Sequence, residues 1–171
     1  MAEPTMIYKI AVLELLKKSG FPLSNSQLSN FFLEGDLTDY FSAQQAISDD
    51  EDAGLISSTT THNSTTYSLT EEGEHTLKLF RDKLNKAMLE DISRYLATNS
   101  IDMKQENSYR ANYTKLAAGG YLVHCKISEE DSTLLDLTMK VGSAEQADTI
   151  CNNWKVRSED VYTSIMDILI N

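Results

Sequence analysis

The residues best suited to acid–base, nucleophilic or metal chemistry are three histidines and two cysteines, and they are scattered. His62 lies in a Ser/Thr-rich stretch, and His75 lies near the start of a predicted helix. His124 and Cys125 are adjacent in a β-like segment, where neighbouring side chains point to opposite faces, so they cannot form a Cys–His dyad. The sequence has no zinc-type spacing, no glycine-rich phosphate loop and no Gly-x-Ser-x-Gly motif. We therefore predict no enzyme, no metal and no cofactor, with Cys125 and Cys151 as buried small hydrophobes.

A second group of polar residues has the hydrogen-bonding chemistry to contact DNA. Glutamine can read adenine, and serine and tyrosine hydroxyls can reach phosphates. Four such residues lie near the start of a predicted third helix, and a histidine and an asparagine lie at the tip of the hairpin that follows. The candidate DNA contacts are Tyr40, Ser42, Gln44, Gln45, His62 and Asn63.

The charge of the same region opposes DNA binding. The chain has no Lys or Arg between Lys18 and Lys78, and that interval holds ten acidic residues. The formal net charge of the whole chain is −11. Because proteins gain DNA affinity by neutralising phosphates, these contacts would be weak anchors. The basic residues of the next helix alternate with acids and are expected to form a solvated face of ion pairs.

The elements that must position these residues are organised around a hairpin between Gly54 and Gly73, where two β-favouring segments flank a polar turn. Apolar spacing predicts helices over 5–18, from a Ser24–Gln27 capping box to Gly35, from Thr38 through Ala53, and from Thr70 to about Ala97. In the last of these a break near Asn85 is one option. This order is typical of a winged helix-turn-helix domain. We assign it to residues 1–80, followed by a connecting helix over 81–98.

The acidic run from Asp49 to Asp52 conflicts with this pattern. Helical spacing from Ile47 calls for an apolar residue at position 50 or 51, but both are acidic. Four acids at a helix C-terminus also oppose the helix dipole. We therefore expect a frayed, solvated last turn, in preference to a metal or partner site.

The second half of the chain, 99–171, is predicted to be a separate α+β domain. After a polar connector over 99–107, strands are expected over 109–114, 121–128 and 132–141, joined by tight turns. Two helices should follow, one opened by a Ser143–Gln146 capping box and one starting after Ser158. Four aromatic residues fall where the sheet meets the helices. They are predicted core, with a small-molecule pocket as the alternative: Tyr109, Tyr113, Tyr121 and Trp154.

Partners and location are predicted from broader features. The apolar stripe of the fourth helix is longer than a three-helix core requires, so it packs either within the chain or against another subunit, and we expect a homodimer. No run of about 18 apolar residues is present, so nothing is expected to span a membrane. The N-terminus lacks a signal-peptide pattern, which makes the cytoplasm the default.

Four segments carry a resemblance to a known family: Phe41-Ser42-Ala43-Gln44-Gln45-Ala46, Tyr67-Ser68-Leu69-Thr70-Glu71-Glu72-Gly73, Val123-His124-Cys125-Lys126 and Ile150-Cys151-Asn152-Asn153-Trp154-Lys155. They resemble a bacterial family of unknown function whose members are usually labelled winged-helix transcriptional regulators. The resemblance implies a winged-helix half joined to an α+β half, and it implies no catalytic residue or ligand. The chain departs from the family pattern at Asp50, where an apolar residue would pack the recognition helix.

Three hypotheses therefore remain open. The first is a winged-helix transcriptional regulator that contacts DNA. The second is an acidic winged-helix module that binds a basic protein partner through the same helix and hairpin. The third is a regulator whose second half senses a ligand.

Overall fold

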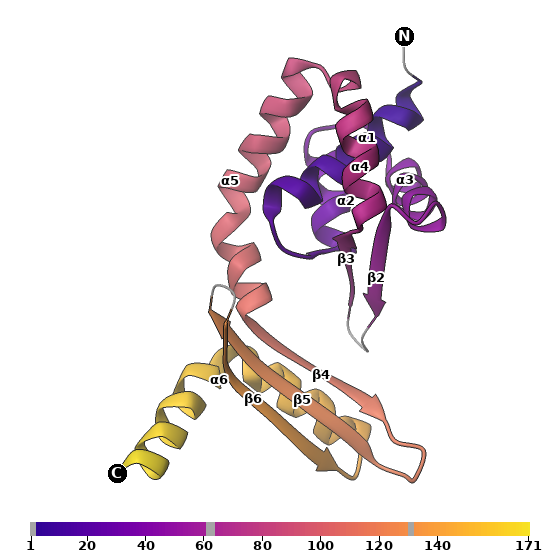
Figure 1. The fold of residues 1–171 in the computed structure, drawn as a ribbon. Helices are drawn as coiled ribbons and strands as arrows, with labels where there is room; N and C mark the ends of the chain where they lie inside the picture. Colours follow the sequence, from indigo (N-terminus) through magenta and orange to yellow (C-terminus); the bar gives the residue numbers. More distant parts are fainter. Residues whose placement is uncertain (1–2, 61–63, 130–131) are drawn as a thin grey trace. The chain divides into compact units, whose positions relative to one another are not determined.

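The structure is a computed structural model that describes residues 3–60, 64–129 and 132–171 of the chain, a mixture of helices and two antiparallel sheets (Figure 1). The described residues divide into two compact units. Unit 1 extends through Ile101 and unit 2 begins at Asp102. Each unit has its own three-stranded sheet.

Unit 1 combines helices with a small sheet in which the strand order is β1-β3-β2 and both pairs are antiparallel. The helix α5 begins in unit 1 and ends in unit 2. The bounds of these elements are α1 (Pro4–Ser19), β1 (Leu23–Ser24), α2 (Asn25–Glu34), α3 (Tyr40–Asp52), β2 (Ile56–Thr60), β3 (Thr65–Leu69), α4 (Glu71–Phe80), the 3-10 helix η1 (Arg81–Lys83) and α5 (Lys86–Ser108).

Local sequence signals set most of these boundaries. Gly20 ends α1 in the left-handed conformation, with φ of 75°. The predicted capping box is confirmed, because Ser24 and Gln27 bond each other's backbone amides. Thr70 caps α4 as expected by accepting from the amide of Gly73. The third helix was assigned the wrong cap: Asp39, one residue beyond Thr38, accepts from the amide of Ser42.

The core of unit 1 forms around α1, which packs against α3, α4 and β3. Its fully buried positions include Val12 and Leu15, and α2 contributes Phe32. Phe31 lies between the rings of Phe32 and Tyr95 in edge-on contacts with centroid distances of 5.1 and 5.5 Å. Burial of this apolar surface is the main stabilising contribution to the unit.

The long helical stretch after Thr70 contains the expected break. Leu84 is extended, and Asn85 accepts a hydrogen bond of 2.8 Å from the amide of Met88 as α5 begins. The predicted polar connector over 99–107 is wrong, because α5 continues to Ser108. Nothing between Lys86 and Ser108 is Gly or Pro, and the buried Met103 gives this polar stretch an apolar anchor.

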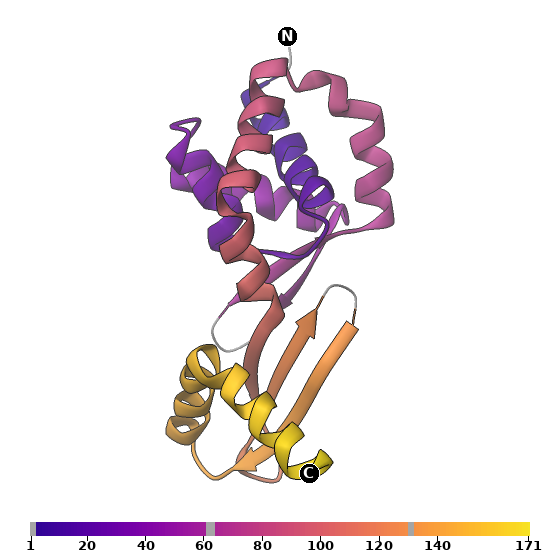
Figure 2. The same cartoon turned by 90° about the vertical axis from the view of Figure 1, so that its left-hand side faces the viewer.

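Unit 2 has the predicted three-stranded antiparallel sheet in the order β4-β5-β6, with one face covered by α6 (Figures 1 and 2). The expectation of two C-terminal helices is wrong, because α6 is continuous. No Gly or Pro interrupts it, and Ser158, the expected start of a last helix, is buried within it. The bounds are β4 (Tyr109–Lys115), β5 (Tyr121–Glu129), β6 (Ser132–Val141) and α6 (Ala144–Ile170).

Among the described residues, none of the helices combines the length and the apolar character needed to cross a bilayer.

Candidate functional site

The N-terminal end of α3 carries an exposed aromatic pair. Phe41 is 82% exposed and Tyr40 is 52% exposed, and their rings meet edge-on with centroids 6.1 Å apart. Asp39 caps this end of the helix, because its carboxylate accepts a hydrogen bond of 2.7 Å from the backbone amide of Ser42. That hydrogen bond keeps the pKa of Asp39 below its ordinary value, so the cap is ionised at neutral pH. A phenyl ring exposed to this extent is available to a partner.

Gln44, a candidate DNA contact, is engaged inside unit 1. Its side-chain amide exchanges two hydrogen bonds with the amide of Asn25, at 2.9 and 2.7 Å, and donates a third to the hydroxyl of Ser29 at 2.7 Å. Asn25 also reaches the hydroxyl of Tyr67 on β3, at 3.4 Å. The network ties α3 to α2 and to the hairpin, so Gln44 could read a base only by breaking these bonds.

The other candidate contacts differ in their exposure. Gln45 is exposed, and its amide donates to the carboxylate of Asp49 at 2.8 Å. Ser42 is half-buried. His62 and Asn63 lie outside the described residues. Tyr40, Ser42 and Gln45 therefore share α3, where Tyr40 and Gln45 are exposed, and no contact joins the three side chains.

The C-terminal end of α3 is acidic but does not fray, which corrects the prediction. The amide of Ala53 bonds the carbonyl of Asp49 at 3.0 Å, and the amide of Leu55 bonds the carbonyl of Asp50 at 2.9 Å. These bonds close the last turn. Asp50 is 1% exposed and occupies the inward position, while Glu51 and Asp52 are exposed.

The buried carboxyl group of Asp50 is under-satisfied, since its Oδ2 atom has no hydrogen-bond partner in the described structure. Burial raises its pKa from 3.8 to about 8, the neighbouring charge of Asp49 adds to the rise, and Lys9 on α1 opposes it. The side chain is therefore mostly protonated at neutral pH. The sequence signal was its place on the apolar stripe of α3, two turns after Ala43 and one turn after Ile47.

An ion pair in unit 1 joins a buried acid to a half-exposed arginine, and the sequence did not predict it. The guanidinium of Arg81 donates two hydrogen bonds of 3.0 Å each to the carboxylate of Glu14, which is only 3% exposed. The pair raises the pKa of Arg81 further, which favours its charged form. Arg81 is exposed, as expected of the solvated face, but it pairs with an acid of α1 and not with one on its own helix. The available signal was a lone acid within the apolar run from Val12 to Leu16.

The four aromatic residues of unit 2 lie between the sheet and α6. Trp154 is 4% exposed and donates from Nε1 to the carbonyl of Lys126 at 3.3 Å. Tyr109, Tyr113 and Tyr121 are half-buried against the same cluster, and the rings of Tyr113 and Tyr121 meet edge-on at 5.7 Å. Burial raises the pKa of Tyr109 and Tyr113. This packing is what a core at a sheet–helix contact requires.

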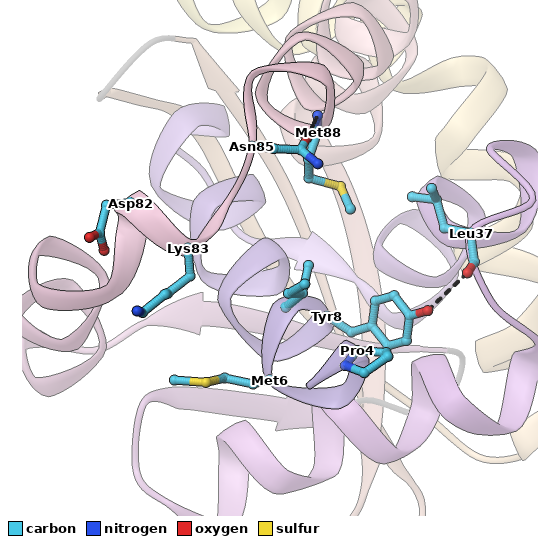
Figure 3. A pocket seen from close by; sticks show the side chains of 9 residues that line it. Pro4, Met6, Tyr8, Leu37, Asp82, Lys83, Asn85 and Met88 are labelled. Atoms are coloured by element: carbon cyan, nitrogen blue, oxygen red, sulfur yellow. Dashed lines mark hydrogen bonds between the residues drawn. The ribbon is translucent and has the colours of Figure 1, made fainter. Parts of the chain in front are cut away.

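A shallow groove of about 960 Å³ occurs in unit 1 instead (Figure 3). Its apolar wall comes from the first turns of α1 and from Leu37 and Met88, while Asp82, Lys83 and Asn85 supply polar groups. The hydroxyl of Tyr8 donates a hydrogen bond of 3.0 Å to the backbone carbonyl of Leu37. Nothing in the sequence predicted this groove.

No group of three or more His, Cys, Asp or Glu within 3–60, 64–129 and 132–171 is placed to hold a metal ion. Cys125 and Cys151 are free and buried in the core of unit 2, and burial raises the pKa of Cys125 to about 11. His124, on the opposite face of β5, pairs with Asp136. The exposed residues of α3, with the aromatic pair at its N-terminal end, form the candidate site.

Comparison with known proteins places the chain in a family whose role has not been assigned. Neither the curated proteins nor the solved structures contain a match to it. Residues 8–169, nearly the whole chain, match one family. The chain belongs to the family described as Domain of unknown function (DUF4364).

Proposed function

We propose that unit 1 is a winged-helix module of a regulatory protein, and that it binds a protein partner through the exposed face of α3. The winged-helix assignment is supported by the order α1-β1-α2-α3-β2-β3 and by the sheet order β1-β3-β2. In this arrangement α3 is the second helix of a helix-turn-helix, the element that such domains present to their partners.

The observation that carries the proposal is the exposure of Phe41 beside Tyr40. Aromatic residues are enriched at protein interfaces and dominate their binding energy. Exposed acids lie at both ends of this helix, with Asp39 at the N-cap and Glu51 and Asp52 in the last turn, and they repel phosphates and attract a basic protein surface. Gln44 is withdrawn into the network with Asn25, which removes the best base-reading group from the face.

Photo-crosslinking tests the proposal. A benzoylphenylalanine replacing Phe41 in the full chain should give discrete adducts with a protein when irradiated in the producing cell. The matched control is the same photoreactive residue at Leu79, an apolar position of α4 that is 63% exposed. Adducts specific to position 41 are expected, and equal labelling at both positions would argue against a binding face on α3.

DNA binding is the second candidate, and the element order of unit 1 is what favours it. Tyr40, Ser42 and Gln45 would supply the contacts from α3. The test is fluorescence anisotropy with a random-sequence duplex, from low to physiological salt. A DNA-binding face predicts affinity that falls linearly with the logarithm of salt concentration. Absence of binding at low salt would exclude general DNA binding.

A further inference from the structure

The strand β6 is a free edge of the sheet in unit 2. The strand order β4-β5-β6 gives it a partner on one side only. It is ten residues long and contains no proline or glycine. A long edge strand presents unpaired amides and carbonyls, so it is a template for another strand. The inner side of β6 is also thinly covered, because α6 packs mainly against β4 and β5 and leaves Met139 38% exposed.

The strand register shows which backbone groups of β6 point away from the sheet. The amide of Leu116 donates to the carbonyl of Gly120, so the β4–β5 ladder ends in a hydrogen-bonded pair. Because bonded and non-bonded pairs alternate, the even-numbered residues of β5 bond β4, and the odd-numbered ones bond the odd-numbered residues of β6. The amides and carbonyls of Asp136, Thr138 and Lys140 therefore face outward. Within the described part of the chain, no group forms a hydrogen bond with them.

These three residues carry a self-complementary charge pattern. Asp136 is acidic, Lys140 is basic, and Thr138 lies midway between them. Alternation along the strand places all three on the outer face of the sheet, since Leu137 and Met139 lie on the face toward α6. In two antiparallel copies of β6 with a two-fold axis at Thr138, Asp136 of each copy lies directly opposite Lys140 of the other. Opposite charges in that position stabilise a sheet, and a shift of the axis by one residue removes both charge pairs.

Both charged side chains are accessible to a second copy. Lys140 forms no ion pair with any other described residue. Asp136 lies opposite Lys126 in the β5–β6 ladder and pairs with His124. Its side chain is nevertheless 51% exposed, so the carboxylate can also accept from Lys140 of a second copy.

The end of α6 leaves an apolar surface on the same side of the sheet. The stripe of α6 that buries Trp154 and Ser158 continues at helical spacing to Ile165 and Ile168. Ile168 and its neighbour Leu169 are each 77% exposed. The last turns of α6 lie beyond the β6 edge, on the side opposite β4 (Figures 1 and 2). A second copy placed against β6 would lie next to these residues and shield them from water.

We propose that two copies of the chain dimerise by antiparallel pairing of β6 with β6, which joins their unit 2 sheets into one continuous sheet. With the axis at Thr138, the outward amides and carbonyls of Asp136, Thr138 and Lys140 all find partners. On the face toward α6, Leu137 of each copy lies opposite Met139 of the other, which covers the exposed part of Met139. The contact is the same surface on both copies, so it closes the dimer. It uses residues of unit 2 alone and is independent of the proposed binding face on α3.

A cysteine at the axis tests the register directly. In a dimer of Thr138→Cys, the two new thiols belong to a hydrogen-bonded pair whose Cα atoms are about 5.5 Å apart, within the span of a disulfide. Mild oxidation of the full-length variant should give a covalent dimer on a non-reducing gel. The matched control is Ser132→Cys, an exposed position of the same strand that lies on the order of 40 Å from its copy about this axis. The native Cys125 and Cys151 are buried in both variants.

A reciprocal charge swap tests the pairing of Asp136 with Lys140. Asp136→Lys and Lys140→Glu should each dimerise at least about tenfold more weakly than the wild type, because both contacts then pair like charges. An equimolar mixture of the two should form a heterodimer, because both contacts are complementary again. Lys115→Glu, an exposed reversal at the end of β4 on the opposite edge, is the matched control and should dimerise like the wild type.

Sedimentation equilibrium measures the full-length wild type and the charge variants, with circular dichroism to verify folding. The proposal is overturned by a wild type that is monomeric at about 100 μM, where a specific dimer is populated. It is also overturned if cysteines at positions 132 and 138 crosslink equally, or if the mixture of folded charge variants stays monomeric. The cysteine test decides the matter where a charge variant does not fold. If the wild type is monomeric but position 41 still crosslinks to another protein, this inference fails while the proposed function stands.

Discussion

Asp50 shows how one side chain can couple proton uptake to the stability of unit 1. The carboxyl group is buried on the inner side of α3, next to α1, and one of its oxygens lacks a partner. A group whose pKa rises from 3.8 to about 8 on folding binds its proton more tightly in the folded state. Its stabilising contribution is therefore complete below pH 4 and is lost progressively as the pH rises to about 8.

We predict that Asp50→Asn removes this pH dependence. Relative to the variant, the wild type should lose up to about 1.4 kcal/mol of unfolding free energy per pH unit between pH 4 and 8, and no more above pH 8. Urea unfolding at pH 5, 7 and 9 measures the difference. Asp52→Asn, on an exposed carboxylate at the end of the same helix, is the control. Parallel pH profiles for the wild type and Asp50→Asn would contradict the prediction.

The pair of Glu14 and Arg81 supplies a second prediction at this scale. Arg81→Met should lower the unfolding free energy by about 2 kcal/mol, because it leaves a buried carboxylate without its partner. The loss is smaller than for a fully buried pair, since the Arg81 side chain is 54% exposed. The double variant Glu14→Leu with Arg81→Met should recover much of the unfolding free energy that Arg81→Met loses. A double variant as unstable as the single one would show that the pair acts through packing.

At the scale of elements, the sequence predicted those whose ends carry a local signal. The capping box at Ser24, the cap at Thr70 and the glycine turn at Gly119–Gly120 fix boundaries through bonds within a few residues. The sequence did not predict that α5 and α6 are continuous, because polar stretches such as 99–107 have the composition of connectors. Each helix continues through its polar stretch with a buried residue as an anchor, Met103 in α5 and Ser158 in α6. The hydrogen bonds that hold Gln44 inside unit 1 could not be predicted either, because their partner Asn25 lies 19 residues away in the sequence.

Gly73 gives a prediction for the contact between α4 and the hairpin. A Cβ atom there would lie 1.9 Å from the carbonyl oxygen of Leu55, so the backbone has to move to accept any side chain. Gly73→Ala should therefore destabilise the protein by about 2 kcal/mol, although alanine is the better helix former. Lys78→Ala, an exposed change in the same helix, is the control. Thermal unfolding measures both, and a stabilised Gly73→Ala would contradict the close approach.

At the scale of the whole molecule, the two units have separate hydrophobic cores. The core of unit 2 is built from β5 and α6 and includes Trp154, the only tryptophan of the chain. The ion pair of Glu14 and Arg81 belongs to unit 1. Tryptophan fluorescence therefore reports on unit 2, while circular dichroism reports on the helices of both units.

We predict that in Arg81→Met the urea transitions measured by circular dichroism and by Trp154 fluorescence no longer coincide. The variant should shift the part of the urea transition seen by circular dichroism to lower denaturant, while the midpoint seen by Trp154 fluorescence stays that of the wild type. This follows because a substitution lowers the stability of the cooperative unit that contains it. The converse control is Val123→Ala in the core of unit 2, which should move the fluorescence midpoint. If Arg81→Met moves both midpoints equally, the units unfold as one, and the separate cores do not define separate cooperative units.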